Sequence, residues 1–133
     1  MRLVAGKVMM DRHAPPALCD TVQSADQDNR ALVRRWHGKG RLSYALTPRF
    51  AITSTAEQLA SAGRLLAEVP DLYVQTHVAE NQDEVRWVGQ LFPQARSYLD
   101  VYDRYGLLGP RSILAHGIWL DEGDWATLRD SGS

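Results

Sequence analysis

The feature that most constrains this chain is a fourfold alternation of short apolar runs with longer amphipathic stretches. The runs have the side-chain types of buried strands and lie at residues 3–10, 42–47, 72–78 and 112–116. Stretches with apolar side chains at helical spacing follow them, at residues 22–37, 54–69, 81–92 and 122–129. A tyrosine-rich segment, residues 98–105, predicts one extra short helix. This order predicts an α/β fold with a parallel sheet, either doubly wound or barrel-like.

The sequence also predicts three details of these elements. The first apolar run, residues 3–10, is predicted to be a single buried strand. Ser54 and Glu57 have the spacing of a capping box, in which each side chain satisfies a free amide at the start of a helix. In the last helix, Trp125 and Leu128 are expected to face inward.

Composition narrows the classes of protein to which the chain could belong. Its 133 residues suffice for one domain, residues 1–133, with a sizeable core. A net charge of -1 and the lack of a basic stripe argue against nucleic-acid and membrane partners. No apolar run approaches the length of a bilayer span, and the first residues are too polar for a signal peptide. A single cysteine, Cys19, excludes an internal disulfide, favours the cytoplasm and is expected to be inert packing.

Two histidines end neighbouring predicted strands. His77 ends the third strand and His116 ends the fourth, and in a parallel barrel such residues point into a shared active-site mouth. Each could be a hydrogen-bonded structural residue, or the two could bind one metal ion. Catalytic zinc uses about three protein ligands, and no third is obvious, so we expect the chain to hold zinc weakly. His13 and His37 are expected on the surface.

Three further residues lie at the same predicted mouth. Glu80, three residues past His77, could exchange protons with metal-activated water, or it could only stabilise the start of the next helix. Arg49 follows the second strand, and its guanidinium could donate two parallel hydrogen bonds to a carbonyl or ring-nitrogen edge. Phe50 could stack on a planar base. The alternative for Arg49 is a solvated loop residue.

Five segments, in this order and spacing, carry a resemblance that covers nearly the whole chain. They are Gly6-Lys7-Val8-Met9-Met10-Asp11, Thr47-Pro48-Arg49-Phe50, residues 75–84 (QTHVAENQDE), residues 98–103 (YLDVYD) and Ala115-His116-Gly117. Together they resemble the guanine deaminases, a family of metal-dependent hydrolases in the amidohydrolase superfamily. A histidine followed three residues later by Glu-Asn would by itself suggest only the superfamily.

The resemblance implies both a fold and a reaction. It implies that residues 1–133 are part of a (β/α)8 TIM-type barrel, about four βα units that correspond to family strands three to six. It implies zinc as cofactor, with His77 and His116 as ligands and Glu80 as the proton-transferring carboxylate. Arg49 and Phe50 would hold and stack the purine. The implied reaction is the hydrolytic deamination of guanine to xanthine and ammonia by zinc-activated water, in purine catabolism.

The departures from the family are equally specific. A His-x-His pair after the first family strand and an aspartate after the eighth have no counterpart in this sequence. We therefore expect a truncated chain with an incomplete site, inactive alone, that forms a homo-oligomer through open sheet edges. Two alternatives remain: a catalytically inactive, self-associating fragment, or an amidohydrolase that deaminates another aminated purine or a triazine.

Overall fold

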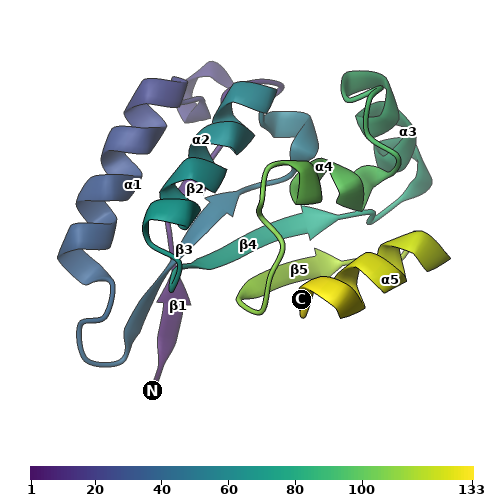
Figure 1. Cartoon of the computed structure of the whole chain (residues 1–133). Coiled ribbons are helices and arrows are strands. Elements are labelled where there is room, and N and C mark those ends of the chain that lie inside the picture. Colours follow the sequence, from purple (N-terminus) through teal and green to yellow (C-terminus); the bar gives the residue numbers. More distant parts are fainter.

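A computed structural model describes residues 1–133 and contains one curled parallel sheet with helices packed along it (Figure 1). The strands are β1 (Leu3–Ala5), β2 (Val8–Met9), β3 (Leu42–Pro48), β4 (Tyr73–Val78) and β5 (Ser112–His116). The helices are α1 (Val22–Trp36), α2 (Ala56–Glu68), α3 (Gln82–Leu91), α4 (Tyr98–Arg104) and α5 (Glu122–Ser131). Two short 3-10 turns, η1 (Pro16–Leu18) and η2 (Ala51–Thr53), complete the chain. The predicted alternation and the extra tyrosine-rich helix are confirmed.

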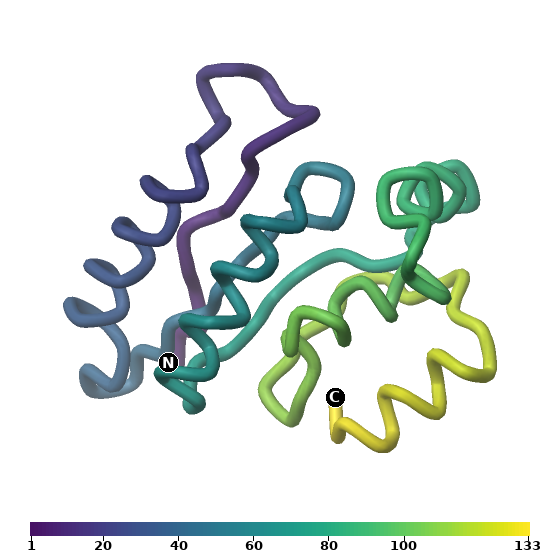
Figure 2. Tube along the Cα trace, turned by 45° about the horizontal axis from the view of Figure 1, so that its top comes forward, coloured from purple at the N-terminus to yellow at the C-terminus, as the bar shows by residue number.

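The sheet has the order β1-β3-β4-β5, with β2 also paired to β3, and every pairing is parallel. Parallel neighbours need crossover connections, which the helices supply. Figure 2 shows α1 and α2 side by side, with α3 and α4 grouped beyond them. The sheet curls into half of a TIM-type barrel, as the family resemblance implied, and is not doubly wound.

The two faces of the sheet have different environments. Along β4, Val74, Thr76 and Val78 are buried against the helices, whereas Tyr73, Gln75 and His77 alternate with them and are only half-buried. The main core lies on the helix side and includes Leu59, Ala62, Val74, Val78, Val88, Phe92, Leu99 and Tyr102. The opposite face encloses a hollow of about 310 Å³, lined mainly by Val4, Val8, Ala45, Thr47, Gln75 and Ile113. This face is the inner wall of the half-barrel.

The prediction of one continuous buried strand at residues 3–10 is wrong. The chain leaves the ladder at Gly6 and Lys7, where a Cβ atom on Gly6 would lie 1.7 Å from the Ala45 carbonyl oxygen. The Lys7 amide donates to the side-chain hydroxyl of Tyr44 and not to a backbone carbonyl of a neighbouring strand. Val8 is 46% exposed, so the run is buried in part only.

Two predictions about helices also need correction. The N-cap of α2 is Thr55, whose hydroxyl accepts from the Gln58 amide, so the cap lies one residue after the predicted Ser54 and the predicted reciprocal bond from Glu57 does not form. In α5, Leu128 packs against the main core as predicted, whereas Trp125 is 57% exposed and does not face inward. The buried residue is its neighbour Asp124, which closes a capping box with Asp121 and thereby fixes the rotation of the helix. None of the five α-helices is both long and apolar enough to span a bilayer.

Candidate functional site

The strands β3, β4 and β5 finish toward one end of the sheet (Figure 1). The predicted site residues lie at or just after these strand ends. Arg49 directly follows β3, His77 is the last but one residue of β4, and His116 is the last of β5. Because the strands are parallel and adjacent, their carboxyl ends share one edge. Glu80 lies two residues beyond the end of β4, at the same edge.

The two histidines face each other, although strand geometry alone would separate them. His77 pairs with Ala115 and Val78 pairs with His116, so strict alternation would direct the two histidines to opposite faces. His116, however, has a φ of 76°, in the left-handed region that few residues other than glycine adopt. This backbone turn breaks the alternation, and the ring centroids lie 5.4 Å apart. A conformation this costly is typical of functional sites.

The orientation of the His77 ring is set by a backbone carbonyl. Its Nδ1 lies 2.8 Å from the carbonyl oxygen of Arg49, which also accepts from the His77 amide at 3.1 Å. A carbonyl can only accept, so Nδ1 carries a hydrogen, and in a neutral imidazole Nε2 then presents a lone pair. Nε2 is therefore the nitrogen that is free to bind a metal ion or to accept a proton.

Glu80 approaches the second histidine. One of its carboxylate oxygens, Oε2, lies 3.4 Å from Nε2 of His116, and the carboxylate is about half exposed. The preceding residue, Ala79, has a φ of 49°, so the chain turns sharply after β4. Hydrogen bonds from Gly117 to Val78 and from Ile118 to Ala79 fasten this turn to the chain after β5. The structure thus brings His77, His116 and Glu80 together.

Arg49 and Phe50 line the neighbouring part of the edge. The Arg49 guanidinium carbon lies 5.1 Å from the centroid of the Phe50 ring, and that ring meets His77 edge-on at 6.5 Å. Arg49 is exposed and Phe50 is half-buried, so both retain surface that a ligand could cover. A flat heterocycle can stack on such a ring while a guanidinium binds its polar edge.

These residues fit a metal ion only as part of its ligand set. Imidazole nitrogens are among the ligands that zinc accepts, and these two facing rings could supply two of them. No group of three or more histidine, cysteine, aspartate or glutamate side chains is arranged to hold one. The contact between Nδ1 of His77 and the Arg49 carbonyl oxygen, which leaves Nε2 without a protein partner, is the observation that favours a metal.

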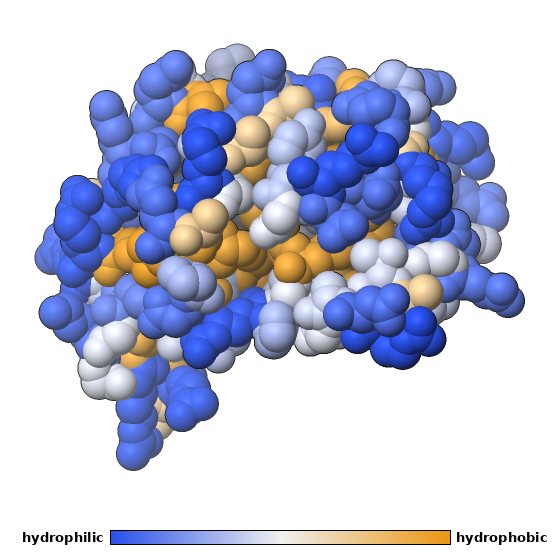
Figure 3. Space-filling model, in the orientation of Figure 1, coloured by the Kyte–Doolittle hydropathy of each residue, from blue (hydrophilic) through white to orange (hydrophobic).

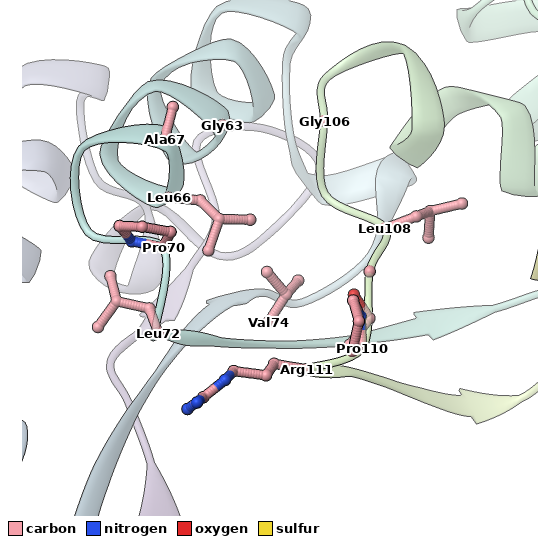
Figure 4. Close-up of a pocket in the computed structure, with 12 residues that line it drawn as sticks. Gly63, Leu66, Ala67, Pro70, Leu72, Val74, Gly106, Leu108, Pro110 and Arg111 are labelled. Atoms are coloured by element: carbon pink, nitrogen blue, oxygen red, sulfur yellow. The ribbon is translucent and has the colours of Figure 1, made fainter. Parts of the chain in front are cut away.

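The most voluminous hollow of the molecule lies elsewhere. A groove of about 440 Å³ runs between α2 and the amino-terminal ends of β4 and β5, and Leu66, Leu72, Val74 and Leu108 contribute its apolar wall (Figure 4). The face seen in Figure 3 carries a hydrophobic band across its middle. In barrels of this type the amino-terminal end of the strands serves stability, whereas chemistry occurs at the carboxyl ends. We therefore assign no catalytic role to this groove.

Two residues that support the site were not predicted from the sequence, and the prediction for a third residue, away from the site, is wrong. Tyr102 is fully buried, and its hydroxyl contacts the backbone of His77. Arg12 donates to the carbonyl oxygens of Ala51 and Ile52 in η2. His37, expected on the surface, is only 12% exposed and lies between the Tyr44 amide and the Asp71 carboxylate. The only signal in the sequence for Tyr102 is general: a tyrosine that is buried usually needs a hydrogen-bond partner for its hydroxyl.

Comparisons with known proteins show the family and the fold of this chain. The sequence model of the Amidohydrolase family matches residues 1–133 of this chain. Guanine deaminase from Escherichia coli is 51% identical over the whole of this chain, which covers 30% of that protein. A probable guanine deaminase from Deinococcus radiodurans is 43% identical over 96% of this chain, a match that covers 29% of that protein. The E. coli guanine deaminase structure superposes with a TM-score of 0.97 over 98% of this chain and 30% of that one.

Two more distant structures delimit what the likeness shows. A guanine deaminase from C. acetobutylicum with bound guanine in its active site has a TM-score of 0.89 at 27% identity, over 95% of this chain and 30% of that one. A variant of an atrazine chlorohydrolase from Arthrobacter aurescens, complexed with zinc and atraton, has a TM-score of 0.87 at 17% identity, over 99% and 30%. The latter shows the fold alone. The chain spans about 30% of the length of the relatives that it matches.

Proposed function

Because this chain belongs to the amidohydrolase family, we propose that it supplies part of the active site of a guanine deaminase. The observation that carries this proposal is the grouping of two imidazoles and a carboxylate at the carboxyl ends of two adjacent strands. Identity of 51% and 43% to guanine deaminases supports guanine as the substrate. The net reaction would be guanine plus water giving xanthine plus ammonia.

His77 and His116 are proposed as two ligands of a zinc ion. A bound zinc ion supplies Lewis acidity, which lowers the pKa of water toward about 7. His77 would use Nε2, because Nδ1–H is engaged by the Arg49 carbonyl oxygen. Catalytic zinc sites use about three protein ligands, so the site needs at least one ligand beyond these two.

Glu80 is proposed to carry protons between water and the purine. Its carboxylate is half exposed and lies beside His116, so both water and the purine could reach it. As the water oxygen forms its bond to C2 of guanine, Glu80 would move one water proton to the neighbouring ring nitrogen, N3. It would move the second to the amino group, which leaves as ammonia as the C2–N bond breaks. General acid–base transfer of this kind contributes about 10² to 10⁴-fold to a rate.

Arg49 and Phe50 are proposed to bind the base. The Phe50 ring offers a stacking face next to His77, and the guanidinium can donate two hydrogen bonds to a carbonyl or ring-nitrogen edge. Another aminated purine or a triazine would also present a flat ring, but the triazine hydrolases share only 17–18% identity with this chain. Guanine is therefore the preferred substrate.

The setting of the protein is part of the proposal. We place it in the cytoplasm, because its one cysteine is a free thiol that a reducing compartment maintains. We also propose a homo-oligomer, because β1 and β5 form the two edges of the sheet and carry exposed Leu3 and Ile113. Neither nucleic acid nor membrane is a proposed partner, given a net charge of -1.

The test is a chimera in which this chain replaces the stretch of E. coli guanine deaminase that it matches over its whole length. Ammonia release from guanine is measured with added zinc. We expect turnover by the chimera, a loss of about 10² to 10⁴-fold in kcat for Glu80→Gln, and no turnover by the 133-residue chain alone. Asp83→Asn is the matched control, because its carboxylate lies three residues away, is 89% exposed and pairs only with Arg86.

Two outcomes would contradict the proposal. A folded, zinc-loaded chimera that ignores guanine but hydrolyses a triazine or another aminated purine would reassign the substrate. Turnover by the 133-residue chain alone, abolished by Glu80→Gln, would show that copies of this chain assemble a complete site.

A further inference from the structure

The hydroxyl of Tyr102 forms a buried junction beneath the candidate site. It donates to the carbonyl oxygen of His77 at 2.7 Å, and it accepts from the Ala51 amide at 3.0 Å and from the Thr76 hydroxyl at 3.1 Å. The side chain is fully buried, although its helix, α4, is short and lies outside the sheet. A buried hydroxyl with three partners is a specific arrangement, since apolar packing alone needs none of them.

The junction uses the whole bonding capacity of a neutral phenol. Burial raises the pKa of Tyr102 well above its usual range, so the hydroxyl keeps its hydrogen at neutral pH. A neutral phenol has one hydrogen, which it donates to the His77 carbonyl oxygen. Its two lone pairs accept from the Ala51 amide and from the Thr76 hydroxyl. Phenylalanine would fill the same space but leave a buried amide and a buried carbonyl without partners.

The two backbone groups that meet at this junction belong to different parts of the site. The His77 carbonyl lies on β4, and the ring of that residue is oriented by the Arg49 carbonyl. The Ala51 amide begins η2, the turn that follows directly from Arg49 and Phe50. The Thr76 hydroxyl, whose one hydrogen goes to Tyr102, also lies 3.3 Å from the Arg49 carbonyl oxygen, so it stands between the two parts of the site.

We infer that Tyr102 is a positioning residue, which holds the imidazole of His77 and the Arg49–Phe50 pair in one fixed relative geometry. This inference rests on the proposed function, in which those groups bind the metal ion and the purine. Tyr102 itself contacts neither site surface, because it is buried on the helix side of β4. Its influence passes through the backbone of His77 and Ala51.

The chain offers a matched control on the same helix. Tyr98 lies one turn earlier in α4, is 4% exposed, and its ring lies 5.8 Å from that of Tyr102. No side chain lies in hydrogen-bonding geometry with the Tyr98 hydroxyl, although that hydroxyl lies near Tyr102 and Glu84. Tyr98→Phe therefore removes a buried hydroxyl of the same kind without removing any of the three hydrogen bonds of the junction.

The experiment compares Tyr102→Phe with Tyr98→Phe in the chimera described above. We expect Tyr102→Phe to lower zinc affinity, and kcat per folded molecule, by about 10 to 100-fold, the effect typical of groups that orient metal ligands. Tyr98→Phe should change both by less than about twofold. A role confined to stability would lower the melting temperature while leaving both quantities per folded molecule unchanged. If Tyr102→Phe does not fold, Thr76→Val removes one arm of the junction and should act in the same direction.

A second measurement separates this inference from the proposed function. In the 133-residue chain, nitrogen NMR reports the Nδ1–H signal of His77, and hydrogen exchange reports the Ala51 amide. We expect both to change in Tyr102→Phe and neither to change in Tyr98→Phe. An inactive parent chimera with these changes present would refute the function and leave the positioning role standing. An active parent chimera in which both phenylalanine variants behave alike would overturn the inference.

Discussion

Replacing Gly63 by alanine tests how closely α2 approaches the chain after α4. Glycine inside a helix usually costs about 0.5–1 kcal/mol relative to alanine, so most such replacements stabilise a protein. Here a Cβ atom on Gly63 would lie 2.0 Å from the carbonyl oxygen of Tyr105, a separation that real Cβ atoms essentially never show. The neighbour is backbone, which has no flexible end that could move aside, so helix and loop must separate by roughly 1 Å.

The two effects oppose each other, and their magnitudes decide the sign. Overpacking a well-packed site costs about 1–3 kcal/mol or more, and this contact is severe enough for the upper part of that range. After the helix propensity gain is subtracted, we expect Gly63→Ala to lower the free energy of unfolding by about 2 kcal/mol. The melting temperature would fall by roughly 5–10 °C.

Gly89 provides the opposite case within the same chain. It lies inside α3, is exposed, and a Cβ atom there would meet nothing within 4 Å. Gly89→Ala should therefore raise the free energy of unfolding by about 0.5–1 kcal/mol. Urea unfolding followed by circular dichroism measures both variants. A Gly63→Ala variant as stable as the parent chain, beside a stabilised Gly89→Ala variant, would refute the close packing of α2 against Tyr105.

Two further predictions concern pH and association. The Asp124 amide donates to the Asp121 carboxylate and lowers its pKa against the opposing effect of desolvation, and Arg96 adds to the lowering. The stabilisation is therefore present above the unfolded pKa, about 3.9, and is lost as pH falls through the lower folded pKa. Asp121→Ala should cost about 1 kcal/mol at pH 7, and the difference should be smaller in urea unfolding near pH 2, where the protonated carboxyl is a weaker cap. A difference of the same size at both pH values would contradict this prediction. Ile113→Lys should reduce self-association in sedimentation velocity, whereas Trp125→Lys, on α5, should not; a monomeric parent chain would contradict this.

The arrangement of strands and the grouping of the site could be predicted from the sequence. Apolar runs and helical periodicity are local signals, and a parallel α/β order brings the carboxyl ends of neighbouring strands together without further information. That placed His77, His116 and Arg49 at one edge before any contact was known. The roles of these residues in chemistry stay predictions.

The supporting contacts could not be predicted, because they join residues that are remote in sequence. Tyr102 is 25 residues from His77 and 51 from Ala51, and no local pattern pairs them. The displaced cap of α2 has a different cause: Ser54 and Thr55 are both good capping residues, and tertiary contacts chose between them. Asp11 binds both the amide and the hydroxyl of Thr55, which holds the cap at that residue.

The seam between the ends of β4 and β5 bears on the thermodynamics of metal capture. Amides of Gly117, Ile118 and Trp119 all donate to Val78 or Ala79, so the backbone beside both histidines is already ordered. A small zinc-finger domain must fold when it binds its ion, and the entropy of ordering subtracts from the affinity. Here the histidine pair is preorganised, so an arriving ion would immobilise little beyond two imidazole rings. Metal uptake should then leave the circular dichroism spectrum of the chain nearly unchanged.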